Sequence, residues 1–192
     1  MLIGYILFFI FYGAYFTKMM LQRRKGIETD QLGKGGKVYG NRTFEIVLKF
    51  TTYLLAMLQL ISVYIFDPKS ILISQLYAGL IISGIGTSIF IIAMYQMKDS
   101  WRAGIDPSAK TDLVTDGLYS FSRNPAFVGF DCFYIGFGIG YSNIIIMFLS
   151  VFTILLFHNQ ILQEEKYLAD EFGEDYIRYM KEVPRYLLLK SN

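Results

Sequence analysis

The chain has 192 residues, of which 54% are hydrophobic and only 18% are charged. A soluble domain of this size could not bury that much apolar surface, so the composition favours a single integral membrane domain over residues 1–192. One cysteine and one histidine exclude an internal disulfide and a metal site built from several Cys or His side chains. The net charge of +2 does not by itself indicate a partner.

Apolar runs long enough to cross a bilayer recur along the chain. Because a bilayer core needs about 20 mostly apolar residues per helix, we predict spans at residues 1–20, 44–66, 71–97, 126–140 and 143–161. The last two come from one apolar stretch that is too long for a single span. It contains the turn-forming residues Gly136, Gly138, Gly140, Ser142 and Asn143. We place a helical hairpin there, which gives an all-α polytopic fold with five transmembrane helices.

The positions of Lys and Arg indicate the orientation through the positive-inside rule. They lie in the first and third connections and in the tail, as Arg23, Arg24, Lys25, Lys34, Lys37, Arg42, Lys98, Arg102, Lys110, Arg123, Lys166, Arg178, Lys181, Arg185 and Lys190. The second connection has only Lys69, and the fourth has none. Five spans with the N-terminus outside therefore place segments 98–125 and 162–192 in the cytoplasm. These cations border the spans and form no separate patch, so nothing indicates nucleic-acid binding.

The tail after the fifth span has an amphipathic pattern over about residues 162–172. Gly173 is a suitable helix stop, and a second short helix over about 174–182 would end before Pro184. We therefore expect an amphipathic C-terminal helix on the cytoplasmic side.

Two polar groups of residues could carry chemistry. Arg123-Asn124-Pro125 closes a long polar connection just before the fourth span, where proline can begin a helix. It is either a functional segment or a membrane-boundary cap. The pair Glu164-Glu165 could bind an amine or another cationic group, or it could be a solvated helix face. His158, just upstream, either lines a cavity or reaches the interface.

These residues together resemble a known family. Gly117-Leu-Tyr119 followed by Ser122-Arg-Asn-Pro-Ala-Phe-Val-Gly129 resembles the Gly-x-Tyr…Arg-His-Pro-x-Tyr-x-Gly signature of the isoprenylcysteine carboxyl methyltransferase and phospholipid methyltransferase families. The glutamate pair and the Phe172-Gly-x-x-Tyr176-x-x-Tyr179 ending are similar to the tail of that family. The resemblance covers roughly residues 97–186. Ser100–Ile105 is similar to a segment of bacterial members, so we expect a bacterial or archaeal plasma membrane.

The resemblance implies S-adenosylmethionine as methyl donor and a lipidic or prenylated acceptor, methylated on a carboxylate or an amine. It implies a donor pocket at the cytoplasmic boundary formed by Leu113, Gly117, Tyr119, Arg123, Asn124, Pro125, Glu164 and Glu165. An acidic side chain of the pair would bind the amino group of the donor, and Arg123 or Asn124 would bind its carboxylate. Aromatic faces such as that of Tyr119 suit its sulfonium.

Asn124 and Phe127 stand where the family has histidine and tyrosine. Asparagine carries no charge and cannot act as a general base near neutral pH. A carboxylate acceptor needs no base, whereas an amine or thiol does, and His158 is the nearby group with a suitable reference pKa. We therefore take Arg123 and His158 as the catalytic candidates.

Two other functions stay open. Membrane sterol reductases share a similar C-terminal arrangement but use NADPH. A non-catalytic membrane scaffold is also compatible with the Asn124 substitution.

Overall fold

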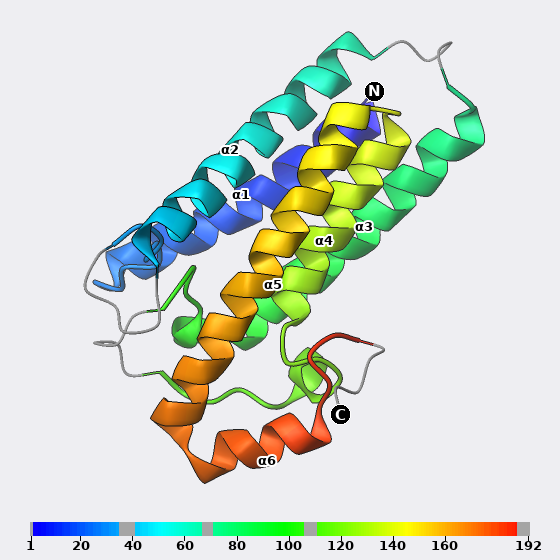
Figure 1. The fold of residues 1–192 in the computed structure, drawn as a ribbon. Coiled ribbons are helices and arrows are strands. Elements are labelled where there is room, and N and C mark those ends of the chain that lie inside the picture. The colour runs from blue at the N-terminus through cyan, green and yellow to red at the C-terminus, as the bar shows by residue number, and fades with distance from the viewer. Residues whose placement is uncertain (1, 35–40, 67–70, 106–110, 188–192) are drawn as a thin grey trace.

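The computed structural model describes residues 2–34, 41–66, 71–105 and 111–187. Lys37, Lys69, Lys110 and Lys190, which entered the orientation argument, lie outside these ranges. The main helices are α1 (Leu2–Arg24), α2 (Arg42–Ile65), α3 (Ile73–Gln96), α4 (Pro125–Gly140), α5 (Ile144–Phe172) and α6 (Glu174–Glu182), shown in Figure 1. Two short 3-10 helices, η2 (Lys98–Ser100) and η3 (Gly117–Ser120), lie between α3 and α4. The described ranges contain no β-strand.

The prediction of an all-α polytopic membrane protein is confirmed. Helices α1, α2, α3 and α5 are long and apolar enough to cross a membrane, whereas α4 is apolar but has only 16 residues. Large apolar side chains such as Phe50, Tyr64 and Phe148 are exposed on the outside of the bundle, where lipid would cover them. The number of five spans stays a prediction.

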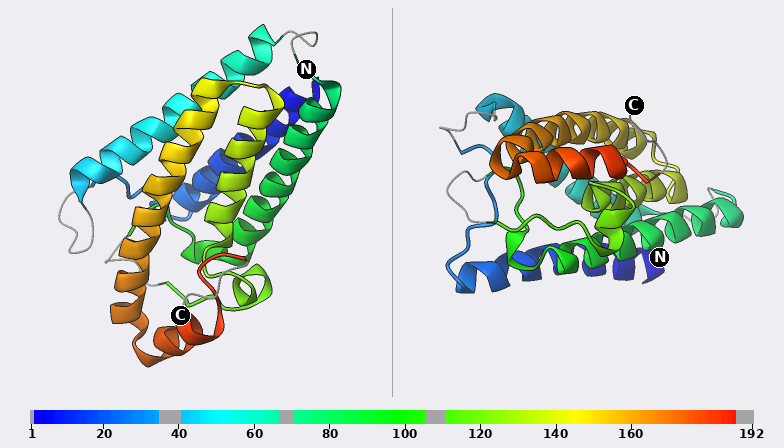
Figure 2. Two further views of the ribbon diagram at one scale, coloured as in Figure 1. Left: turned by 45° about the vertical axis from the view of Figure 1, so that its right-hand side comes forward. Right: turned by 90° about the horizontal axis from the view of Figure 1, so that it is seen from below.

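The long helices run alternately up and down, so the connections gather at two ends of the bundle (Figure 1). The beginning of α1 and the α4–α5 turn lie at one end. The ends of α1, α3 and α5 lie at the other end, together with η3, and α6 runs across it (Figure 2). Arg23, Arg102, Arg123 and Arg185 belong to this second end. The side of the membrane that it faces stays a prediction.

Helices α3 and α4 approach each other through glycines. A Cβ atom on Gly86 would lie 2.6 Å from the carbonyl oxygen of Gly129, and one on Gly136 would lie 2.6 Å from that of Gly79. Small residues let backbones come this close, which is a common way to pack helices in membranes. The aromatic core beside this contact includes Phe11 stacked on Phe133, with ring centroids 3.9 Å apart.

The structure has the predicted turn at Ser142 and Asn143, between α4 and α5, but Gly136, Gly138 and Gly140 are not part of it. All three glycines lie within α4, and the turn follows at residues 141–143, where Ser142 has a positive φ of 47°. Asn143 then caps α5, because its side-chain oxygen accepts hydrogen bonds from the backbone N–H of Ile145 and Ile146. Gly136 and Gly140 instead contact α3.

The apolar span and the amphipathic tail form one continuous helix. α5 extends over 29 residues and ends at Phe172, and the next residue, Gly173, has a φ of +55° that suits glycine. α6 follows at once, over the segment that the sequence predicted as a short helix. This places Glu164, Glu165 and the end of α6 at the same end of the bundle.

Replacing Gly86 with Ala should push α3 and α4 apart and lower the free energy of unfolding by about 1–3 kcal/mol, because the new methyl group meets backbone atoms. Gly84→Ala on the same helix is the matched control, since its Cβ would lie 3.9 Å from the nearest atom, Leu7 Cδ2. Thermal unfolding in detergent measures both. Equal effects of the two variants would contradict the close backbone contact.

Candidate functional site

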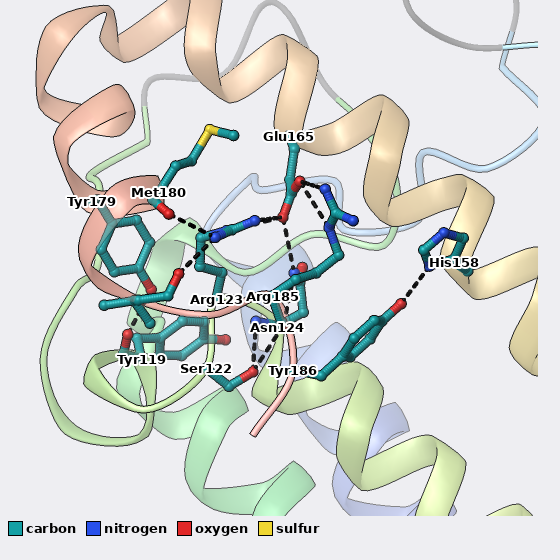
Figure 3. A network of polar contacts seen from close by, with 11 residues as sticks. Tyr119, Ser122, Arg123, Asn124, His158, Glu165, Tyr179, Met180, Arg185 and Tyr186 are labelled. Carbon is teal, nitrogen blue, oxygen red and sulfur yellow. Dashed lines mark hydrogen bonds and ion pairs between the residues drawn. The ribbon is translucent and has the colours of Figure 1, made fainter. Parts of the chain in front are cut away.

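The carboxylate of Glu165 lies at the centre of a polar network at the α6 end of the bundle (Figure 3). Its Oε1 accepts hydrogen bonds from Nε and Nη2 of Arg123, at 3.0 and 2.9 Å. Its Oε2 accepts hydrogen bonds from Nε and Nη2 of Arg185, at 3.0 and 2.7 Å. The side chains of Arg123 and Glu165 are only 1% and 6% exposed. We call Arg123, Glu165 and Arg185 the carboxylate clamp.

Arg123 also binds the chain after α6. Its Nη1 donates to the carbonyl oxygens of Met180 and Val183, at 3.0 and 2.6 Å. Its backbone N–H donates to the carbonyl oxygen of Pro184 at 2.9 Å. The side-chain bonds use four of the five N–H donors of the guanidinium. Arg123 therefore joins the start of α4 to α5 and to the end of α6.

The clamp holds Glu165 in its charged form. Burial by itself raises the pKa of this carboxyl group, but the hydrogen bonds from Arg185 and the charge of Arg123 outweigh burial, so the pKa lies below its ordinary value. The hydrogen bond with Glu165 raises the pKa of Arg185 in turn. The three side chains thus form a charged unit in which Arg123 and Glu165 are buried and Arg185 is partly exposed.

Gly117 begins η3 in a conformation that favours glycine, with a φ of +61°. A Cβ atom there would lie 1.9 Å from Nε2 of Gln96, at the end of α3. The Oε1 of Gln96 accepts a hydrogen bond from the backbone N–H of Leu118 at 2.9 Å. Tyr179 of α6 donates its hydroxyl hydrogen to the carbonyl oxygen of Tyr119 at 2.6 Å. Contacts with α3 and α6 therefore hold η3 in place.

Asn124 and Pro125 begin α4, with proline in the first turn as predicted. The side chain of Asn124 does not cap the helix. Its Nδ2 lies 3.4 Å from Oε1 of Glu165 and 3.4 Å from the carbonyl oxygen of Arg185. The residue that stands where the resembled family has histidine therefore faces the clamp.

His158 lies apart from the clamp. Its Nδ1 is 2.8 Å from the hydroxyl oxygen of Tyr186, beyond α6 (Figure 3). It lines neither of the two cavities described next. The structure therefore places the predicted base outside both of these cavities.

Two cavities lie next to each other at this end of the bundle. The smaller has a volume of about 150 Å³ and is lined by polar and aromatic side chains, among them Asp112, Tyr119, Asn124, Glu164, Tyr176 and Tyr179. The larger has a volume of about 380 Å³ and lies among α1, α2, α4 and α5, with mostly apolar lining residues such as Phe8, Tyr12, Phe130, Tyr134 and Phe157. A polar compartment thus adjoins an apolar one.

The two cavities share six lining residues, which we call the cavity boundary: Trp101, Arg102, Gly104, Ala126, Phe127 and Glu164. Glu164 Oε1 accepts a hydrogen bond from Nε2 of Gln160 at 2.9 Å. The adjacent glutamates therefore differ in role. Glu165 is enclosed by two arginines, whereas Glu164 borders both cavities.

The structure brings five predicted pocket residues to the smaller cavity: Leu113, Tyr119, Arg123, Asn124 and Glu164. Gly117, Pro125 and Glu165 do not line it. Arg185, which the sequence pattern indicates only as a charge that sets topology, and Gln96 were not predicted as site residues. A carboxylate pair followed by an arginine after a short helix is the signal that could have indicated Arg185.

Comparison with known proteins identifies the class. Residues 74–175, just over half of the chain, match the family model described as Phospholipid methyltransferase, and the chain belongs to that family. It is an integral membrane protein of this family.

The curated relatives are more specific. The Protein-S-isoprenylcysteine O-methyltransferase of Schizosaccharomyces pombe is 38% identical over 95 residues, covering 48% of this chain and 40% of the relative. The protein of the same name from Saccharomyces cerevisiae is 33% identical over 95 residues, covering 48% of this chain and 40% of the relative. The one from Rattus norvegicus is 32% identical over 111 residues, covering 56% of this chain and 39% of the relative. The chain thus spans about two fifths of their length. These relatives are eukaryotic, so they do not support the expected bacterial or archaeal origin.

A solved structure supports the fold. The eukaryotic intramembrane Ras methyltransferase ICMT (isoprenylcysteine carboxyl methyltransferase) matches with a TM-score of 0.59 at 20% identity, over 74% of this chain and 53% of that chain. At this identity the likeness concerns the fold alone.

Replacing Glu165 with Ala should lower the free energy of unfolding by about 3–5 kcal/mol, because it leaves the buried Arg123 guanidinium without its carboxylate. Glu171→Ala, at an exposed position on the same helix, should change it by less than about 0.5 kcal/mol. Thermal or denaturant unfolding in detergent measures both. A small effect at Glu165 would show that the clamp does not stabilise the fold.

The clamp should also give the protein a pH-dependent stability. The pKa of Glu165 is lower in the folded than in the unfolded protein, so its stabilising contribution is complete above the unfolded pKa of about 4.3 and is lost as the pH falls through the folded pKa. The melting temperature of Glu165→Gln should therefore fall less than that of the unmodified protein between pH 6 and pH 3. Parallel pH profiles would contradict this assignment.

Proposed function

We propose that this protein is an S-adenosylmethionine-dependent methyltransferase that acts on a lipidic or prenylated acceptor at the cytoplasmic boundary of the membrane. The observation that carries the proposal is the polar cavity that adjoins an apolar cavity at Arg102 and Glu164. Such a pair of compartments suits a reaction between a polar donor and a lipid. Membership of the family and the names of the relatives support methyl transfer as the reaction.

The chemistry of the smaller cavity suits the donor. Glu164 supplies a carboxylate for its ammonium group, and Asn124 supplies an amide donor for its carboxylate. Tyr119, Phe127 and Tyr176 supply aromatic surfaces for its base and its sulfonium. The volume is below the roughly 300–1,000 Å³ that is usual for ligand pockets, so the donor would extend across the cavity boundary. When bound there, S-adenosylmethionine would supply an electrophilic methyl group.

The larger cavity suits the hydrocarbon part of the acceptor. Its aromatic walls come from α1, α4 and α5, within the apolar part of the bundle. Each methylene group buried there would contribute about 0.8 kcal/mol to binding. A chain seated in this cavity would present its polar end at the cavity boundary. Holding donor and acceptor in line in this way can lower the barrier by up to about 7–11 kcal/mol.

The positions of the titratable groups favour a carboxylate acceptor over an amine. The only histidine of the chain, His158, binds Tyr186 and lines neither cavity. An ionised carboxylate needs no base, whereas an ammonium group must first lose its proton. In this proposal Arg123 and Glu165 shape the wall of the donor cavity, and Glu164 contacts the donor.

Donor binding should be visible as thermal stabilisation in detergent. S-adenosylmethionine and its demethylated product, S-adenosylhomocysteine, should raise the melting temperature, and NADPH should not, because only a ligand of the folded state stabilises it. Glu164→Gln should weaken donor binding about 10- to 100-fold through loss of a charge-assisted hydrogen bond. Glu171→Gln, at an exposed position, is the control.

The outcomes separate the three candidate functions. Stabilisation by NADPH alone would favour a reductase, and no response to any of the three ligands would favour a scaffold. Labelled methyl transfer into a total lipid extract, followed by identification of the product, tests the activity itself. Methyl incorporation that is unchanged in Glu164→Gln would contradict the assigned donor site.

A further inference from the structure

The cavity boundary carries one positive and one negative side chain. Of its six residues, Arg102 is the cation and Glu164 is the anion. Two other cations line one of these two adjoining cavities each. Lys49 belongs to the larger cavity and Arg123 to the smaller. Arg102 is therefore the cation that both compartments share.

The backbone around Arg102 is fixed by contacts with the chain after α1. Ala103 N–H donates to the carbonyl oxygen of Thr29 at 2.9 Å, and Gln31 N–H donates to the carbonyl oxygen of Ala103 at 2.9 Å. The side chain of the buried Gln22 donates to the carbonyl oxygen of Trp101 at 3.1 Å. These bonds lie on both sides of Arg102, so its Cα has a defined position relative to the cavities.

The guanidinium is oriented as well. Its Nη1 donates to the carbonyl oxygens of Asp99 and Trp101, at 2.6 and 2.9 Å. These contacts fix the plane of a group whose rigid, planar set of donors matches a carboxylate.

We propose that Arg102 binds the carboxylate of the acceptor and holds it at the cavity boundary. This inference rests on the proposed function and adds the residue that would select the acceptor. Arg102 and Glu164 would sort the two reactants by charge, because Glu164 attracts the cationic donor and Arg102 attracts the anionic acceptor.

The chemical step is balanced without an added base. One oxygen of the carboxylate forms a bond to the methyl carbon while the carbon–sulfur bond of the sulfonium breaks, and its electron pair stays on sulfur. The products are a neutral methyl ester and a neutral thioether sulfur, and no proton moves. Because the ester has lost the negative charge, Arg102 would bind it more weakly than it binds the acceptor, which favours product release.

A competing assignment is that Arg102 binds the carboxylate of the donor, since it also lines the smaller cavity. The experiment therefore measures donor and acceptor separately for Arg102→Gln and Arg102→Lys. Donor affinity is measured by calorimetry with S-adenosylhomocysteine in detergent. Acceptor use is measured as methyl transfer to an S-prenylated N-acetylcysteine, with its carboxamide as a neutral competitor.

Arg102→Gln should raise the KM for the carboxylate acceptor at least tenfold and change the donor Kd less than twofold. It should also remove the preference for the carboxylate over the carboxamide, and Arg102→Lys should restore part of that preference. Arg178→Gln is the control, because the Arg178 side chain on α6 is 70% exposed and the substitution removes a cation away from the cavities. That variant should leave both constants within twofold.

Several results would overturn the proposal. Equal losses of donor and acceptor affinity in Arg102→Gln would assign the residue to the donor instead. A larger effect of Lys49→Gln than of Arg102→Gln on the acceptor KM would assign the carboxylate to Lys49. If the unmodified protein binds the donor but does not methylate the carboxylate acceptor, the acceptor assignment fails while the donor site stands. If it binds no donor, the proposed function itself fails.

Discussion

A buried carboxylate held between two guanidinium groups organises this end of the protein. Removing three charged groups from water is costly, and such a unit persists because each partner satisfies the others. Through Arg123, Glu165 connects the start of α4 to the chain after α6, and through Arg185 it holds that chain against α5. Of these segments, α5 and the start of α4 line the smaller cavity, through residues such as Asn124 and Tyr167. The shape of the candidate site therefore depends on the charge of a residue that does not line it.

The adjacent residues Glu164 and Glu165 of α5 have different surroundings. Successive residues on an α-helix point about 100° apart, so Glu165 enters the clamp while Glu164 turns toward the cavity boundary. A pair of neighbouring acids could otherwise compete for one ligand. Here Glu165 binds Arg123 and Arg185, and Glu164 lies beside both cavities, where it accepts a hydrogen bond from Gln160. The proposed donor contact therefore falls on Glu164 alone.

The bilayer explains why the two compartments differ. A cavity among α1, α2, α4 and α5 is lined by the apolar side chains that membrane helices require. The connection after α3, η3 and α6 lies beyond the apolar part of these helices and can carry Asp112, Asn124 and tyrosine hydroxyls. A polar cavity and an apolar cavity can adjoin only where these regions meet. In this protein that boundary carries Arg102 and Glu164.

The sequence by itself determined the all-α membrane class, the approximate extent of the helices, the stop at Gly173 and the family. These follow from hydropathy, from glycine and proline chemistry and from motif order, which are all local along the chain. Only the tertiary structure decided that Arg185 closes the clamp, that Gly136 and Gly140 contact α3 and that His158 binds Tyr186 away from the cavities. Such contacts join residues 20 to 60 or so positions apart, and their partners depend on how the helices rotate and cross. The local sequence pattern does not determine that rotation. It could therefore identify candidate functional residues but could not predict which of them are in contact.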